Sequence, residues 1–252
     1  MRIEHPDASR IPQLRKLWKE AFGDSDAFLD GFFAFGFSPE RCRCIVEDGE
    51  VVSALYWFEG ICRGQRFAYL YAVATAASHR GRGLFTALLE DVKQILSGQG
   101  FDGILLVPET EKLCRMYEKL GFSVCTSVNF YQICAGKEPI AVSETDAGTY
   151  MSLRRAYLPE GAVLQEGALL PFLNSQYRFY AGDGWLAAGQ TYEGKLVCQE
   201  FLGDISAMEG LVRALGADLG EFRTPGRTRP FTWILPLREG CTRPEYFAFA
   251  LN

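Results

Sequence analysis

The sequence lacks the features of a membrane protein, of an exported protein and of a metal-binding protein. It has no run of about 18 apolar residues and no N-terminal basic segment followed by an apolar one, so we expect neither a membrane span nor export. Its eight cysteines include no C-x-x-C pair, and it has only two histidines, which predicts that no metal is bound. We therefore expect reduced, mostly buried thiols and a cytoplasmic location.

The chain also lacks an excess of positive charge. A net charge of −5 and a pI near 5.3 argue against nucleic acid or an anionic membrane surface as the partner, and they are compatible with a cationic amine substrate. The hydrophobic share of 48% and the aromatic share of 13% suit a soluble globular protein. At 252 residues the chain is long enough for one large domain or two of ordinary size.

The most informative stretch is a strand, a turn of glycine and arginine, and a helix, which follow one another from Val73 onward. The helix is predicted by apolar residues on one face of a 3.6-residue period, namely Phe85, Leu88, Leu89, Val92 and Leu96. Gly81 and Gly83 can take positive φ, so that backbone N–H groups at the helix N-terminus form a nest for a phosphate. Arg80 and Arg82 add positive charge and forked donors. The stretch therefore predicts a site for a phosphorylated ligand.

This turn matches neither the G-x-x-x-x-G-K-[ST] motif of nucleoside triphosphate sites nor the G-x-G-x-x-G motif of dinucleotide sites. It resembles instead the [RQ]-x-x-G-x-[GA] loop of the GCN5-related N-acetyltransferase (GNAT) superfamily, here Arg80-Gly81-Arg82-Gly83-Leu84-Phe85. The wider string is most similar to the branch that includes the enhanced-intracellular-survival aminoglycoside acetyltransferases. The resemblance implies that the loop amides hold the pyrophosphate of acetyl-coenzyme A. Phe85 stands where the pattern has a small residue, so we expect its side chain to turn away from the pyrophosphate.

The resemblance also implies which groups act on the thioester. In GNAT enzymes the strand that enters the loop carries a bulge, and a backbone N–H there polarises the thioester carbonyl; Val73, Ala74 and Thr75 are the matching positions. The segment Met116-Tyr117-Glu118-Lys119-Leu120-Gly121-Phe122 resembles the downstream Y-x-K-x-G-F signature. The tyrosine of that signature protonates the leaving thiolate in many members, so Tyr117 is the expected acid. Its place on an apolar helical stripe leaves a packed core tyrosine as the alternative.

The order of elements divides the chain after residue 136. Residues 1–136 predict a strand, two helices, three antiparallel strands leading into the loop, the loop helix, a strand at 102–107, a helix at about 110–120 and a pair of short strands over 123–133. Residues 137–252 repeat this order more faintly and end in strands near 231–237 and 245–251. We therefore expect an α/β (α+β) GNAT fold, with a mixed central sheet flanked by helices, followed by a second, degenerate GNAT-like domain that lacks the coenzyme A loop.

The sequence does not identify a general base. Glu59, Glu109 and Glu111 are expected near the cleft, with a solvated carboxylate as the alternative for each. His79 is a further candidate because imidazole is a common general base, but its place on the shoulder of the loop favours contact with solvent or phosphate. The C-terminal carboxylate is the base in the survival-protein branch, which makes Asn252 a further candidate.

Together these features predict a cytoplasmic acyltransferase that moves acetyl from acetyl-coenzyme A to a primary amine by direct attack. The acceptor is expected to be a small-molecule or peptide amine, and the sequence gives neither its identity nor the oligomeric state. The alternative is a coenzyme A-binding sensor or structural protein that has lost transfer. The cluster of Arg223, Arg227 and Arg229 is a candidate contact for an anionic substrate, with a solvated loop as the alternative.

Overall fold

The computed structural model describes residues 1–165, 167 and 169–250, and it contains two compact units. The first unit comprises Met1–Ser123 and Trp233–Thr242, and the second comprises Val124–Thr232 and Arg243–Asn252. The expected division after residue 136 differs from these units because the strand over Ser123–Cys134 pairs with a strand of the second unit. No helix in the described part of the chain has the length and apolarity that a membrane crossing requires.

The first unit is built on a mixed sheet in the order β1-β2-β3-β4-β5-β12. Its strands are β1 (Arg2–Glu4), β2 (Cys42–Glu47), β3 (Glu50–Cys62), β4 (Gln65–Thr75), β5 (Gly103–Leu106) and the Trp233–Pro236 part of β12 (Arg229–Pro236). Neighbouring strands are antiparallel except for β4 and β5, which are parallel. A parallel pair needs a crossover, and the loop and helix after β4 supply it.

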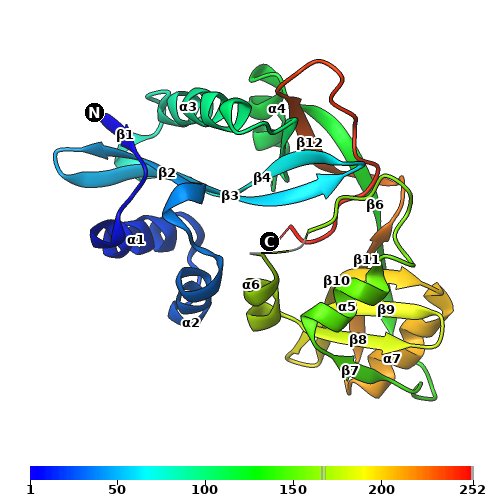
Figure 1. The fold of residues 1–252 in the computed structure, drawn as a ribbon. Coiled ribbons are helices and arrows are strands. Elements are labelled where there is room, and N and C mark those ends of the chain that lie inside the picture. The colour runs from blue at the N-terminus through cyan, green and yellow to red at the C-terminus, as the bar shows by residue number, and fades with distance from the viewer. Residues whose placement is uncertain (166, 168, 251–252) are drawn as a thin grey trace. The chain divides into compact units, whose positions relative to one another are not determined.

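The helices of the first unit cover both faces of this sheet (Figure 1). They are α1 (Ile11–Phe22), α2 (Asp26–Gly31), α3 (Leu84–Gly98) and α4 (Glu111–Lys119), with a π-helical segment at Phe32–Gly36 after α2. Leu55 and Trp57 of β3 are buried in the same core as α3. Tyr56, which points to the opposite face, packs against Trp18 of α1 with ring centroids 5.2 Å apart. The aromatic segment around Phe32 therefore belongs to the second face of the core.

Two-residue turns that end in glycine join β2 to β3 and β3 to β4. Asp48-Gly49 has φ of 50° and 86° at its two residues, and Arg63-Gly64 has 50° and 75°. Two consecutive positive φ angles are typical of the type I′ turn that joins antiparallel strands, and glycine tolerates such angles best. These local signals therefore fix the register with which β2, β3 and β4 enter the sheet.

The second unit repeats this plan with a sheet in the order β6-β11-β10-β9-β8-β7. Its strands are β6 (Ser123–Cys134), β7 (Ser143–Thr145), β8 (Arg178–Gly182), β9 (Trp185–Tyr192), β10 (Lys195–Gly203) and β11 (Leu219–Pro225), and its helices are α5 (Ala147–Arg154), α6 (Leu169–Gln176) and α7 (Met208–Ala214). Strands β10 and β11 are parallel and are joined through α7, as β4 and β5 are joined through α3. The expected internal repeat is therefore present in the order of elements.

Two expectations about strands are wrong. Residues 123–133 do not form two short strands but lie in the single strand β6, since no glycine or proline interrupts it. The apolar segment 245–250 forms only an isolated bridge, between Tyr246 and Ala162. The side chain of Gln165 bonds to the backbone of Ala248 and Phe249, so this buried segment satisfies part of its polar backbone without joining the sheet.

Candidate active site

The strand that enters the glycine-arginine loop is bulged and leaves its neighbour. Opposite β3, Ala74 pairs with Ala54 and Tyr71 with Tyr56, so two residues of β4 face Leu55 alone. The first of them, Ala72, has φ of 48°. Strand β4 pairs with β5 only over Phe67–Tyr69. Val73, Ala74 and Thr75 thus lie on the part of β4 that has left β5, which is where the resemblance expects backbone groups to meet the thioester.

Hydrogen bonds to two other elements, β3 and α1, hold the end of β4 and the start of the loop. The hydroxyl of Ser53 on β3 donates to the carbonyl oxygen of Ala74, at 2.9 Å, and lies 2.8 Å from Oγ1 of Thr75. The N–H of Ala77 donates to Oε1 of Glu20 on α1, at 2.6 Å. Since these contacts fix both ends of the bend, the loop backbone is held before any ligand arrives.

Two glycines set the backbone of the loop. Gly81 and Gly83 have φ of 77° and 75°, and a Cβ atom at either would meet no atom within 4 Å. Glycine is therefore required for conformation rather than for space. Gly83 caps α3 without a side-chain hydrogen bond, and no described group accepts from the N–H of Gly81, Gly83 or Leu84. These donors, together with the positive end of the helix dipole, are suited to binding an anion.

The arginines of the loop are held by protein groups. Nε of Arg80 donates to the carbonyl oxygen of Thr75, at 3.0 Å. Both terminal nitrogens of Arg82 donate to the carboxylate of Glu47 at the end of β2, at 2.9 and 3.1 Å. Nε2 of His79 lies 3.7 Å from the same carboxylate, and hydrogen bonding from Arg82 lowers the pKa of Glu47. The arginine side chains thus brace the loop, and the backbone N–H groups are left to face an anion.

Phe85 and Tyr117 pack against each other. Leu84 at the start of α3 is buried, and the ring of Phe85 meets that of Tyr117 edge to face, with centroids 5.7 Å apart. Phe85 is therefore packed against the hydrophobic core, as expected from its place on the apolar face of the helix. The ring of Tyr117 also contacts Phe122, at 5.6 Å, and only 7% of the residue is exposed. Burial raises the pKa of Tyr117 to about 12, so its hydroxyl is protonated at neutral pH and its ring is part of the core.

The candidate bases are engaged elsewhere or lie on the surface. Glu59 accepts two hydrogen bonds from Arg66, at 2.8 and 3.0 Å, and these lower the pKa of Glu59. A carboxylate held in this way is a weak base. Glu109 and Glu111 are exposed. Asn252 lies outside the described residues.

Sequence reasoning missed Glu47, Glu20 and Ser53, which hold the loop in place. Each lies at least 20 residues before its partner in the sequence, and each is brought to the loop only by the pairing of β2 with β3, by the pairing of β3 with β4 or by the packing of α1. No local pattern marks such residues.

Comparison with known proteins identifies the first unit. The family model described as acetyltransferase (GNAT) domain matches residues 2–125. The chain therefore contains a GNAT acetyltransferase domain. The match spans the bulged strand, the glycine-arginine loop and Tyr117. A search among curated proteins finds no match to this chain.

Solved structures extend the similarity over both units. A GCN5-related N-acetyltransferase from Anabaena variabilis matches with a TM-score of 0.70 and 17% identity, over 94% of this chain and 73% of that one. Eis1 from Mycobacterium abscessus matches with a TM-score of 0.66 and 14% identity, over 94% and 74%. A tandem GNAT protein from the clavulanic acid biosynthesis pathway matches with a TM-score of 0.60 and 10% identity, over 95% and 99%. These likenesses concern the fold, and they confirm the expected GNAT fold followed by a second GNAT-like unit.

Proposed function

We propose that this protein transfers an acetyl group from acetyl-coenzyme A to a primary amine. The observation that carries the proposal is the anion site at the N-terminus of α3, placed directly after a strand that has left its parallel neighbour. In this assignment the N–H groups from Gly81 to Phe85 bind the pyrophosphate, with Arg80 and Arg82 bracing the loop. The parted end of β4 lies beside the thioester, so that an N–H of Val73, Ala74 or Thr75 polarises its carbonyl.

Tyr117 stabilises the leaving group in this proposal. A thiol such as that of coenzyme A has a pKa near about 8.5, below the pKa of about 12 of Tyr117. Complete proton transfer from the phenol to the thiolate is therefore uphill. The tyrosine acts as a hydrogen-bond donor to the developing charge, and the thiolate takes its proton from solvent after it leaves.

The acceptor amine must lose a proton before it attacks. An alkyl amine has a pKa near about 10.4, so only a small fraction is neutral at pH 7. Because Arg66 holds the carboxylate of Glu59, that carboxylate is a weak base. We therefore propose that the reaction uses the neutral fraction of the amine and that its rate rises with pH as that fraction grows. We also propose that the reaction occurs in the cytoplasm.

Calorimetric titration of acetyl-coenzyme A into the wild type and into Gly83→Glu tests the site. We expect micromolar-range binding to the wild type, and none to the variant, because a glutamate side chain adds negative charge beside the pyrophosphate site. The matched control is Gly64→Glu, since Gly64 has the same φ of 75° and the same free space but lies in the β3–β4 hairpin. Failure of the wild type to bind would exclude the proposal, and equal loss in both variants would assign the effect to backbone strain.

A coenzyme A-binding protein without transfer is the second candidate, and the engagement of Glu59 favours it. Assay of thiol release with a panel of amines separates the two. For an enzyme, Tyr117→Phe should lower kcat by about 10- to 100-fold, the worth of a hydrogen bond to a charged group, while the affinity for acetyl-coenzyme A is kept. An unchanged kcat would remove Tyr117 from the mechanism, and no turnover by the wild type with any amine would favour the binding protein.

A further inference from the structure

In the second unit, as in the first, two parallel strands separate at one end, but no glycine-arginine loop follows. Strand β10 has a register shift against β9 between Cys198 and Glu200, so Gln199 is an extra residue. The parallel pairing of β10 with β11 ends at Cys198 and Phe222, while each strand continues with its other neighbour. At the end of β10, however, Asp204 binds the N–H of Ser206 and caps the following turn. A carboxylate at this place repels phosphate, so any ligand of this unit is bound by other groups.

A cavity of about 630 Å³ lies where β10 and β11 separate. Its lining includes Cys198 and Gln199 of β10, Arg223 of β11 and Phe130 and Tyr131 of β6. A volume of this size is within the range of sites for small organic ligands, which run from about 300 to 1,000 Å³. All of its lining residues belong to the second unit.

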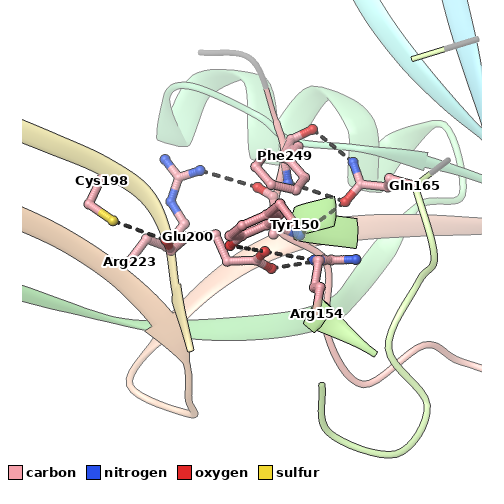
Figure 2. Close-up of polar contacts among 8 residues, drawn as sticks. Tyr150, Arg154, Gln165, Cys198, Glu200, Arg223 and Phe249 are labelled. Atoms are coloured by element: carbon pink, nitrogen blue, oxygen red, sulfur yellow. Dashed lines mark hydrogen bonds and ion pairs between the residues drawn. The ribbon is translucent and has the colours of Figure 1, made fainter. Parts of the chain in front are cut away.

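Two arginines in the cavity lie against aromatic rings. Arg223 is 8% exposed, and its guanidinium lies 4.4 Å from the ring centroid of Phe231. One of its terminal nitrogens donates to the carbonyl oxygen of Ala248, at 3.3 Å; Figure 2 shows it beside Cys198 and the C-terminal segment. The guanidinium of Arg229, which is exposed, lies 4.7 Å from the centroid of Phe130. Stacking holds each guanidinium plane in place and leaves its edges to donate hydrogen bonds.

The carboxylate in the lining is already paired. Glu221 accepts from Lys195, at 2.7 Å, and from the side chain of Gln132, at 3.0 Å. These bonds neutralise the negative charge at that end of the cavity. The two arginines therefore give the cavity a net positive charge, in a protein whose net charge is −5.

We propose that this cavity binds a small organic anion with a flat apolar body, through its carboxylate at Arg229 and its ring against Phe130 and Tyr131. The aromatic walls and the volume favour such a ligand over an inorganic anion, which would leave the apolar lining in water. Arg223 is buried and contributes mainly its charge. The inference concerns the second unit alone and does not depend on coenzyme binding by the first.

The test is calorimetric titration of 2-naphthoate into the full-length protein, with 2-naphthamide as the uncharged counterpart. We expect naphthoate to bind and the amide to bind at least about tenfold more weakly, because a charge-assisted hydrogen bond is lost. The variant Arg229→Gln should weaken naphthoate binding to a similar extent. Arg227→Gln is the matched control, since Arg227 is exposed just before β12 but does not line the cavity.

Three results would overturn this inference: no binding of naphthoate, equal binding of acid and amide, or equal losses in the two arginine variants. Displacement of naphthoate by an equal concentration of inorganic phosphate would also do so, by showing an unselective anion site. The variant Gly83→Glu distinguishes ligand binding by the second unit from ligand binding by the first. Naphthoate binding should persist in that variant whether or not acetyl-coenzyme A binds to the first unit.

Discussion

We predict that Glu200→Gln lowers the free energy of unfolding of the second unit by about 3–5 kcal/mol, the cost of removing one partner of a buried ion pair. Arg154 and Glu200 have side chains that are 1% and 0% exposed. Nε and Nη2 of Arg154 donate to the two carboxylate oxygens, at 2.6 and 2.8 Å, and the hydroxyl of Tyr150 donates to Oε2, at 2.9 Å (Figure 2). Glutamine keeps the shape of the side chain but removes the charge. An arginine remains protonated at any ordinary pH, so its charge is left buried and uncompensated.

The loss of stability in Glu200→Gln should extend to the C-terminal segment. The guanidinium of Arg154 lies 5.3 Å from the ring centroid of Phe249, and Gln165 donates to the carbonyl oxygen of Phe249 at 2.9 Å. A displaced Arg154 no longer supports that ring. Backbone amides near Phe249 should therefore exchange with solvent faster in Glu200→Gln than in the wild type.

Urea unfolding followed by circular dichroism and by tryptophan fluorescence, to which the buried Trp185 of the second unit contributes, measures the effect. The control is Glu144→Gln, because Glu144 pairs with Arg178 in the same unit with side chains that are 56% and 70% exposed. That change should cost less than about 1 kcal/mol. The paired change Arg154→Leu with Glu200→Leu should recover part of the loss, because it leaves no isolated charge. If Glu200→Gln cost no more than Glu144→Gln, the reasoning from burial would be refuted.

Two further predictions concern the first unit. If Arg82 braces the loop through Glu47, then Arg82→Ala and Glu47→Gln should each weaken acetyl-coenzyme A binding several-fold in calorimetry. The double variant should bind no more weakly than either single variant, because both changes break the same contact. Tighter binding by Glu47→Gln would instead make Arg82 a phosphate ligand. Because Arg66 lowers the pKa of Glu59 below its ordinary 4.5, their pairing stabilises the fold above that value and is lost as pH falls through the lowered pKa. The melting temperature of Glu59→Gln should accordingly lie below that of the wild type at pH 7 and meet it in strong acid, and a difference independent of pH would contradict this assignment.

Several features of the first unit could be predicted from residues that are close together in the sequence. Asp48-Gly49 turns the chain, Gly81 and Gly83 take positive φ, and the apolar period from Phe85 to Leu96 lies within α3. In each case the conformation depends on steric limits within a few residues. The same locality misled the prediction at 245–250, where an apolar run resembles a strand but has no strand beside it to complete a ladder.

The sequence by itself determined the motif, a strand, a glycine turn and a helix N-terminus that together suit a phosphorylated ligand, and its resemblance to the GNAT family implied the bulge and the type of fold. Only the tertiary structure decided which side chains hold that turn in place and which are engaged by other groups. It directs Arg82 to Glu47 and Glu59 to Arg66, and it buries Tyr117 until its pKa rises to about 12. The reason is physical: a side chain's charge and exposure depend on the strands and helices that fold against it, and those partners lie too far along the chain for any local pattern to register them.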